Sequence, residues 1–254
     1  MSSRTKKLPP SKPVLPAAQE WDFENVVTED EAPVDGLYSQ KQMPLLSEPL
    51  DGAWAGPGND RPFVVMDNVG LFYDPSKPPL VPDMMLSLDV SAPASPFPKK
   101  NRSYFVSVYR KPPDVVVEIV SNSKGKEDTV KKRTYAKIGV LYYVIWDPDE
   151  YLGIGPLSVF KLHGKSYKKF NDLWFPELNL GLKIWHAEFR GFEEDWLRWC
   201  DREGNLIPTI DEEKRRADRE TRRADREAQR AADAIRQAEE LAARVRELES
   251  RTKE

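Results

Sequence analysis

The run from Pro112 to Ser121 constrains this chain most, because it resembles a buried strand and yet contains a carboxylate. The β-branched density from Val115 to Val120 is typical of a central strand that is covered on both faces. Glu118 lies inside this run. Burying an ionised carboxylate without a partner is costly, so we expect Glu118 to be paired, protonated or bound to a metal ion. A salt-bridged core glutamate and a functional carboxylate both fit this stretch alone.

The composition indicates one sizeable globular core with non-globular ends. The chain has 254 residues, of which 39 % are hydrophobic and 32 % are charged, so it is too polar to be globular throughout. A single cysteine, Cys200, rules out an internal disulfide and fits a reducing compartment. No stretch approaches the roughly 20 apolar residues of a membrane span, and the N-terminus has no apolar signal core. We therefore expect a cytoplasmic protein without membrane partners.

The charges are unevenly distributed along the sequence. The net charge is only -3, which by itself does not indicate a nucleic-acid partner. From Pro98 to Lys137, however, the chain contains 11 Lys and Arg but only 4 Asp and Glu. Residues 1–60 contain 5 Lys and Arg and 10 Asp and Glu. The region around Glu118 is therefore basic in sequence, with a local excess of seven positive charges.

The chain divides into three predicted parts. Residues 1–34 combine proline and charge with few apolar side chains, so they are predicted to form a disordered arm. Residues 35–210 form the predicted folded domain, which begins with a short helix capped by Ser39 and ended near Pro49. Residues 211–254 form a charged helix.

The folded domain contains several predicted strands and a second apolar run with an acid. Leu80 to Leu88 is almost entirely apolar but contains Asp83. Residues 61–73 are predicted to form a strand, a turn and a second strand. An aromatic-rich stretch, residues 173–210, is expected to pack across the sheet. The remaining predicted strands are Tyr104–Tyr109, Leu141–Trp146 and a hairpin of Leu157–Leu162 with Ser166–Phe170.

A helix is predicted from Glu127 to the C-cap glycine Gly139. At about 100° per residue, its apolar side chains fall on one arc, into which Lys131 also projects, whereas Lys132 lies outside it. One lysine therefore faces inward. The residues of the arc are Val130, Tyr135 and Ile138.

The C-terminal residues 211–254 follow a heptad pattern. Five near-repeats of seven place mostly alanine on the two seam positions, so little apolar surface is buried per heptad. The segment carries 13 acidic and 13 basic side chains. A solvated single helix and a weak coiled coil both fit this pattern. A homodimer, formed through this helix or through the core, is one predicted assembly.

Asp83, Glu118 and Lys131 together suggest a catalytic constellation. If the two acidic runs are neighbours in a sheet, both carboxylates converge at one edge of it. Two converging carboxylates are how proteins hold Mg²⁺, which lowers the pKa of a bound water and offsets charge on a phosphate. An inward Lys131 then stabilises that charge or orients the water. These are the parts of a metal-dependent phosphodiesterase.

The motifs resemble those of the bacterial Uma-type endonucleases in the PD-(D/E)XK, restriction-endonuclease-like superfamily. They are Val81-Pro82-Asp83, then Pro113-Asp114 to Ser121, then Lys131-x-x-x-Tyr135-Ala136 to Asp147-Pro148. The resemblance covers roughly residues 36–208. It implies an α/β (α+β) fold with a mixed, four-stranded central sheet flanked by helices. It also implies that Asp83 and Glu118 bind Mg²⁺ or Mn²⁺.

This sequence departs from the superfamily pattern in one position. The pattern has a lysine two residues after the acid, where this chain has Val120, so Lys131 is the candidate replacement. A further helical acid often assists, for which Glu48 and Glu127 are candidates. The leading hypothesis is a metal-dependent endonuclease that hydrolyses DNA. The alternative is a catalytically silent domain that binds DNA or a protein.

Overall fold

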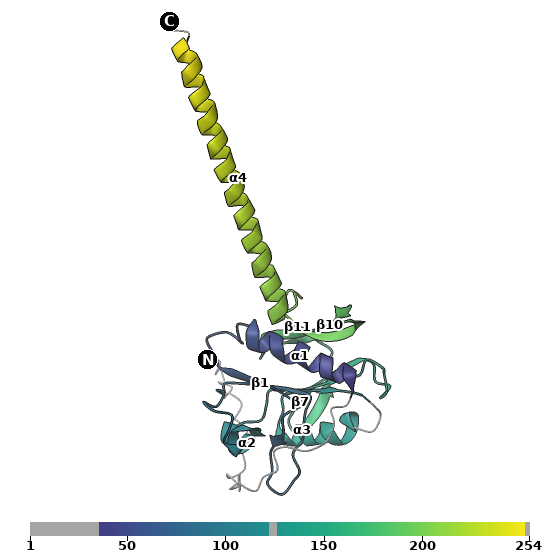
Figure 1. Cartoon of the computed structure of the whole chain (residues 1–254). Coiled ribbons are helices and arrows are strands. Elements are labelled where there is room, and N and C mark those ends of the chain that lie inside the picture. Colours follow the sequence, from purple (N-terminus) through teal and green to yellow (C-terminus); the bar gives the residue numbers. More distant parts are fainter. Residues whose placement is uncertain (1–35, 122–125, 252–254) are drawn as a thin grey trace, which may run out of the picture. The chain divides into compact units, whose positions relative to one another are not determined.

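The computed structural model describes residues 36–121 and 126–251 (Figure 1). The described residues divide into two compact units, with the boundary in the chain between Ile207 and Pro208. The first unit contains all the strands among them, and the second consists mainly of the helix α4 (Ile210–Arg251). The predicted arm, residues 1–34, lies outside the described residues. Within the described part of the chain, no helix is long and apolar enough to cross a membrane.

A six-stranded mixed sheet forms the centre of the first unit. The strand order is β1-β3-β5-β6-β7-β8. Only β5 and β6 are parallel, and every other neighbouring pair is antiparallel. The predicted mixed sheet is confirmed, but it has six strands instead of four, because β1 and β8 pair with the edges of four inner strands. The bounds are β1 Phe63–Asp67, β3 Met84–Leu88, β5 Val115–Ile119, β6 Tyr142–Trp146, β7 Leu157–His163 and β8 Ser166–Lys169.

Three of the four inner strands, β3, β5 and β6, are buried along their full length. All five residues of β3, β5 and β6 are buried, as expected of strands that are covered on both faces. Their side chains alternate between two apolar clusters, one on each face. On β5, for example, Val115, Val117 and Ile119 join the first cluster, whereas Val116 joins the second. Glu118 alternates with Val117 and Ile119, so it faces the second cluster.

Helix α1 (Leu37–Gly52) and a three-stranded sheet cover the first face. That sheet has the order β11-β10-β9, with β9 Trp174–Phe175, β10 Leu180–Phe189 and β11 Phe192–Cys200. Gln42 on α1 exchanges two 2.8 Å hydrogen bonds with the backbone of Leu197. The indole of Trp199 donates to the carbonyl oxygen of Leu46 at 2.8 Å. The aromatic-rich stretch therefore packs over the sheet through α1, as expected.

The predicted boundaries of α1 are wrong. The helix begins after Gly36, whose φ is 106°, and Ser39 is buried inside it instead of capping it. It also continues through Pro44 and Pro49 to Gly52. A proline in a helix interior costs about 3 kcal/mol. The buried apolar side chains of α1 provide a compensating gain that local propensity does not reveal.

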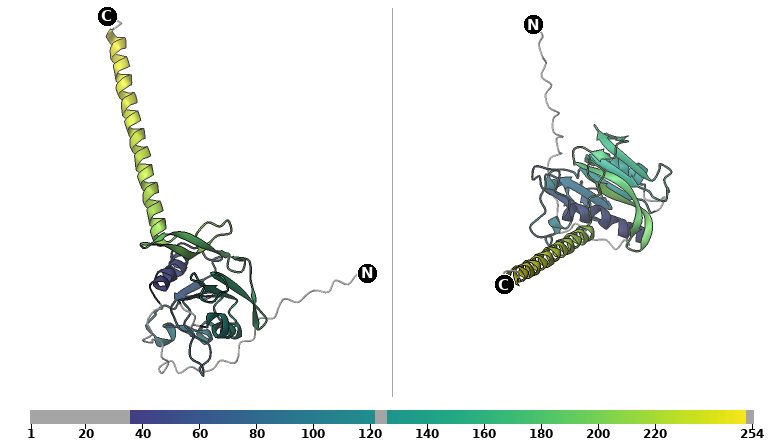
Figure 2. Two further views of the ribbon diagram at one scale, coloured as in Figure 1. Left: turned by 90° about the vertical axis from the view of Figure 1, so that its right-hand side faces the viewer. Right: turned by 90° about the horizontal axis from the view of Figure 1, so that it is seen from above.

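Helical segments cover the second face, opposite α1 (Figure 2). They are the π-helical turn η2 (Glu127–Lys131), α3 (Lys132–Ile138) and the short α2 (Val106–Tyr109). Gly139, with φ of 98°, caps α3 as predicted. A two-stranded parallel ribbon of β2 (Leu71–Phe72) and β4 (Tyr104–Phe105) and the 3-10 turn η1 (Lys99–Asn101) complete the unit.

The predicted strand Tyr104–Tyr109 is only partly formed. It stops after Phe105, and the chain turns into α2, which Arg110 ends with φ of 61°. The rings of Tyr104 and Tyr109 stack with centroids 4.3 Å apart. A strand advances about 3.3 Å per residue, so it would hold these rings much farther apart. Stacking of Tyr109 on the buried Tyr104 therefore accompanies the turn.

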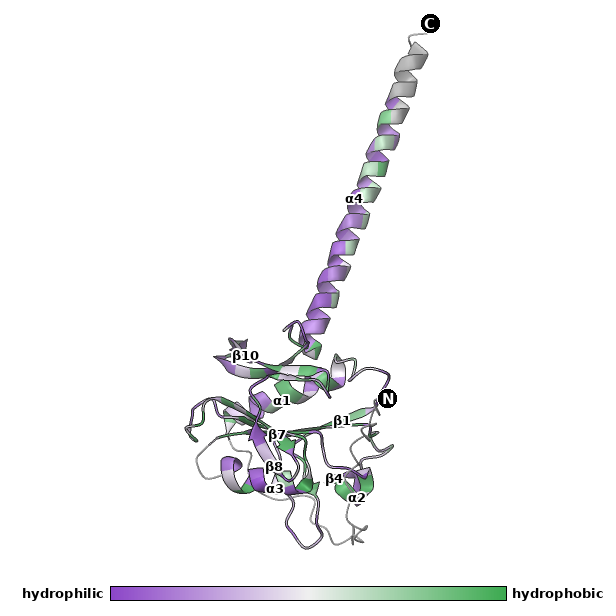
Figure 3. Ribbon diagram, turned by 180° about the vertical axis from the view of Figure 1, so that it is seen from behind, coloured by the Kyte–Doolittle hydropathy of each residue, from purple (hydrophilic) through white to green (hydrophobic). Residues whose placement is uncertain are grey.

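The second unit is a single charged helix. Its N-terminus has a reciprocal cap, in which the backbone N–H of Thr209 donates to Glu212 and that of Glu212 donates to Thr209 Oγ1. Along α4, Arg223 pairs with Glu227 at 2.9 Å. Most of the coloured part of α4 is hydrophilic (Figure 3), and the large apolar side chains that the structure describes on it, such as Ile235 and Leu241, are exposed. The predicted C-terminal helix is therefore confirmed.

Candidate active site

Asp83 and Glu118 lie side by side at one end of the central sheet. In the antiparallel register of β3 and β5, Met84 is opposite Val117. Asp83, one residue before β3, thus stands opposite Glu118. The backbone N–H of Ile119 donates to Asp83 Oδ2 at 2.6 Å. The structure therefore brings the two acids of the apolar runs together.

Glu118 is buried and held at both carboxylate oxygens. Its exposed fraction is 1 %. Lys131 Nζ donates to Oε2 at 2.9 Å, and the hydroxyl of Tyr135 donates to Oε1 at 2.6 Å. Glu118 thus has the ion-pair partner that its buried position requires, and this partner is the inward lysine of the helix.

The electrostatics of the pair keep Lys131 charged and Glu118 close to its titration point. Burial raises the pKa of Glu118 to about 7, with the charge of Lys131 opposing the shift and that of Asp83 adding to it. Burial disfavours the ammonium of Lys131, but Glu118 and then Glu127 raise its pKa above the ordinary value. Burial, followed by the charge of Glu118, raises the pKa of Tyr135 well above its ordinary value, so its hydroxyl remains a hydrogen-bond donor.

Glu127 adds a third carboxylate on the helical side of the site. Its side chain is buried, and its Oε1 accepts a hydrogen bond from Lys131 Nζ at 3.2 Å. Among the residues that the structure describes, Glu127 Oε2 has no hydrogen-bond partner. The π-helical turn from Glu127 to Lys131 widens the start of the helix, a distortion that often occurs at functional sites. A buried acceptor without a donor can serve a cation or a water molecule.

The donor set fits a hard cation that retains much of its water shell. Asp83 and Glu118 provide adjacent carboxylates, and Asp83 Oδ2 and both oxygens of Glu118 each have a second lone pair beyond the hydrogen bond described above. Over residues 36–121 and 126–251, no group of three or more His, Cys, Asp and Glu side chains could hold a metal ion. A pair of carboxylates nevertheless suffices for Mg²⁺, which usually keeps several waters.

The two candidates for an assisting acid have different positions. Glu48 belongs to α1, on the face of the sheet opposite Glu118, and it pairs with Arg190 at 3.5 Å. Glu127 lies on the same side as Glu118 and shares Lys131 with it. The structure therefore brings Glu127, and not Glu48, to the other candidate residues.

Val120 is buried in the apolar cluster of the second face, with 3 % of its surface exposed. Its backbone N–H donates to the carbonyl oxygen of Trp146 at 2.8 Å, which extends the pairing of β5 with β6. The side chain is apolar, so the ammonium group next to Glu118 comes from the helix instead of the strand. Lys131 occupies that place.

Tyr135 contacts Glu118, although the sequence pattern assigned no chemical role to it. Its position on the apolar arc indicated a core side chain, and its ring does pack against Tyr143 with centroids 5.0 Å apart. The available signal was its spacing of four residues from Lys131, which places both side chains on one helical face. A tyrosine on that face can reach the same carboxylate as the lysine.

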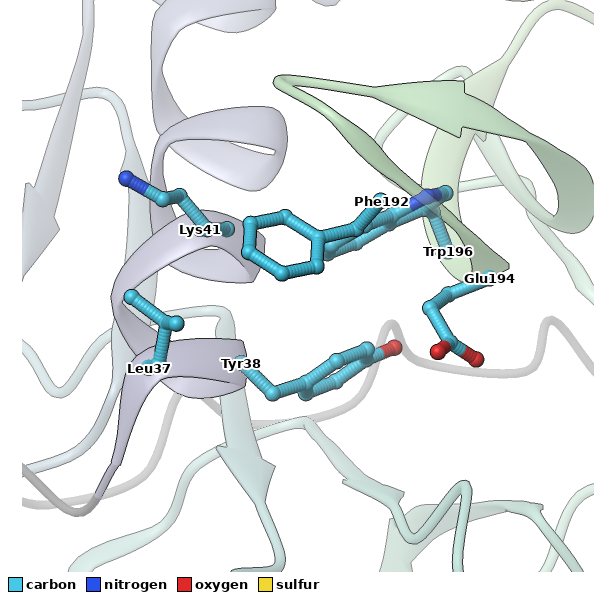
Figure 4. Close-up of a pocket in the computed structure, with 6 residues that line it drawn as sticks. All are labelled: Leu37, Tyr38, Lys41, Phe192, Glu194 and Trp196. Atoms are coloured by element: carbon cyan, nitrogen blue, oxygen red, sulfur yellow. The ribbon is translucent and has the colours of Figure 1, made fainter.

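A separate pocket of about 240 Å³ lies between α1 and β11 (Figure 4). The ring of Tyr38 stacks on Trp196 there, with centroids 4.9 Å apart. None of the candidate catalytic residues lines it. The lining residues are Leu37, Tyr38, Lys41, Phe192, Glu194 and Trp196.

Comparison with known protein families identifies one match. Residues 29–182, more than half of the chain, match the Uma2 family model, which is described as putative restriction endonuclease. A solved structure of a putative nuclease belonging to DUF820 from Anabaena variabilis is 18 % identical, with a TM-score of 0.29. That alignment covers 46 % of this chain and 59 % of the other chain. No curated protein matches the sequence. The family match includes Asp83, Glu118 and Lys131.

Proposed function

Because the chain belongs to the Uma2 family, we propose that it is a nuclease that hydrolyses DNA phosphodiester bonds with the help of Mg²⁺ or Mn²⁺. One observation carries this proposal. The buried Glu118 stands opposite Asp83 and is in contact with the ammonium of Lys131. A purely structural ion pair needs only Lys131 and Glu118, whereas the additional acid beside them repels Glu118 and raises its pKa.

Asp83 and Glu118 are the residues that would hold the metal ion. When bound, the ion supplies an activated water and neutralises charge on the phosphate. The N–H of Ile119 fixes the carboxylate of Asp83, and the hydroxyl of Tyr135 fixes that of Glu118. Both acids are therefore oriented before any ligand arrives, which reduces the reorganisation that binding requires.

Lys131 would act as a fixed positive charge. Its raised pKa keeps it protonated at neutral pH, so it cannot serve as the base that takes a proton from water. Its ammonium can instead donate hydrogen bonds to a phosphate oxygen and stabilise the negative charge that develops there. This role requires only a position beside the acids, which the helix provides in place of the strand residue Val120.

A plasmid cleavage assay with Mg²⁺ or Mn²⁺ tests the proposal. The variants are Asp83→Ala, Glu118→Ala and the isosteric Glu118→Gln, with Glu48→Ala as the control acid on the opposite face. We expect the first three to lose cleavage by at least about a hundredfold, the usual contribution of such groups. Glu48→Ala should retain it. Cleavage that persists in the Asp83 and Glu118 variants would exclude this site.

A catalytically silent domain that binds DNA or a protein is the second candidate function, and the apolar Val120 at the motif position favours it. This candidate predicts salt-dependent DNA binding without cleavage under any metal condition. Metal binding that depends on Asp83 would argue against it. Isothermal titration of the wild-type chain and Asp83→Ala with Mn²⁺ makes the distinction.

A further inference from the structure

A groove of about 370 Å³ lies between α3 and the β7–β8 hairpin, on the side of the sheet that carries Glu118. Figure 3 shows α3 and β8 as neighbours. The groove is more polar than the pocket beside α1. Its lining residues are Asp128, Thr129, Lys132, Arg133, Ala136, Lys137, Lys165, Ser166 and Tyr167.

Positive charge dominates this groove. Four of its lining residues are basic and only Asp128 is acidic. Arg133, Lys137 and Lys165 are exposed, and among the described residues none of them forms an ion pair. Clustered like charges repel one another, so a polyanion that binds there relieves the repulsion.

Lys132 shows how closely the basic side chains approach one another. Burial lowers the pKa of Lys132, and the nearby charge of Lys169 lowers it further, although Asp128 opposes the shift. The Lys132 ammonium lies 3.3 Å from the centroid of the Phe160 ring. Lys169 and Phe160 are directly opposite each other in the β7–β8 pairing, so the basic surface extends onto the hairpin.

The groove and the candidate active site lie on either side of one helical segment. Glu127 and Lys131 face Glu118, and the residues that follow each of them, Asp128 and Lys132, line the groove. One helical segment thus separates the two. A phosphate chain in the groove therefore contacts the same helical segment, η2–α3, that carries Glu127 and Lys131.

We propose that this groove binds the sugar-phosphate backbone of a DNA duplex and positions one strand at Asp83 and Glu118. The inference rests on the proposed nuclease function. Charge complementarity selects the partner, since a duplex carries one negative charge per about 1.7 Å of its axis. Arg133, Lys137 and Lys165 are positioning residues that contact phosphates and do not read bases.

The test measures binding without metal, so it is independent of cleavage. A fluorescent DNA duplex is titrated with wild-type chain and with the triple variant Arg133→Gln, Lys137→Gln, Lys165→Gln over a range of salt concentrations. Each lost phosphate contact should reduce the slope of log K against log salt by about 0.9, giving about 2.7 for the triple variant. The matched control replaces the exposed Lys77, Lys183 and Lys214 with Gln.

The outcomes separate the two proposals. A slope that decreases in the groove variant and not in the control supports the groove. An equal effect in both variants, or no effect in either, overturns it, as does tighter groove-dependent binding to an RNA duplex of the same sequence. If the groove binds DNA but no metal supports cleavage, the catalytic assignment fails and the groove assignment stands. Unchanged circular dichroism confirms that the substituted chains are folded.

Discussion

The two charged helical segments of this protein use the same residue types in opposite ways. The segment η2–α3 holds Lys131 against Glu118, a carboxylate whose side chain is 2 % exposed. On α4, Arg223 pairs with Glu227, but their side chains are 81 % and 62 % exposed. Exposed pairs contribute little to stability, whereas breaking a buried pair leaves a charge without compensation. Burial, and not the number of charges, therefore decides which pair matters.

Comparing the stability of the Lys131→Met variant with that of the Arg223→Met variant tests this difference most directly. Removing Lys131 leaves Glu118 buried without its cation, so we expect the free energy of unfolding to fall by about 3 kcal/mol. The α4 substitution should change it by less than about 0.5 kcal/mol. Urea unfolding at pH 8 measures both. Equal effects in the two variants would contradict the assigned difference in burial.

The pH dependence of stability is a second test of the difference between the buried and the exposed carboxylate. The pKa of Glu118 is raised from its ordinary value near 4.5 to about 7, so the folded state binds this proton more tightly than the unfolded state. The resulting stabilisation is complete below about pH 4.5 and is lost as the pH rises through about 7, at up to about 1.4 kcal/mol per pH unit.

The difference between the unfolding curves of wild-type chain and Glu118→Gln isolates this contribution from those of other carboxylates. That difference should depend on pH mainly between about 4.5 and 7. A constant difference for Glu118→Gln would show that Glu118 does not titrate there.

Tyr135→Phe has a smaller expected effect. It removes the hydrogen bond to the Glu118 carboxylate, which should cost about 1.5 kcal/mol and raise the pKa of Glu118 further. Tyr143→Phe is the matched control, because its hydroxyl donates to the backbone carbonyl of Glu127 at 2.9 Å. Only the Tyr135 variant should move the pH midpoint of stability upward. If both variants move it equally, Tyr135 does not position Glu118.

Deleting residues 211–254 should have the smallest effect on the rest of the chain. The seam of α4 is mostly alanine, so any self-association through it is weak. We expect the melting temperature of the remaining domain to change by no more than a few degrees. Sedimentation equilibrium at high protein concentration should show a lower degree of association after the deletion. An unchanged degree of association would exclude α4 as the contact between copies.

Several elements could be predicted because their signals are local. The β-branched run of β5, the Gly139 cap and the heptad pattern of α4 each depend only on residues that are neighbours along the chain. The inward position of Lys131 was also predicted, although Val130, expected on the same arc, is 53 % exposed. The arc assumes an α-helical period, and the π-helical turn η2 changes that period at its start.

Other features depend on partners that are distant in sequence. Gln42 and Leu197 meet across the core, and this contact accompanies the helical path of α1 beyond the position where proline predicted an end. Stacking of Tyr109 on Tyr104 likewise accompanies the turn after Phe105. Local propensity differs between such alternatives by about 1 kcal/mol or less per residue, so tertiary packing decides between them.

The sequence alone determined that Glu118 lies in a buried strand, that it requires a partner, and that a lysine faces inward from the next helix. Only the tertiary structure decided that Asp83 stands opposite Glu118, that Tyr135 and Glu127 complete the cluster, and that Glu48 does not. The physical reason is that long-range pairing sets the register of strands and the face of the sheet on which an element packs. Burial and periodicity, in contrast, can be predicted from the order of residues along the chain.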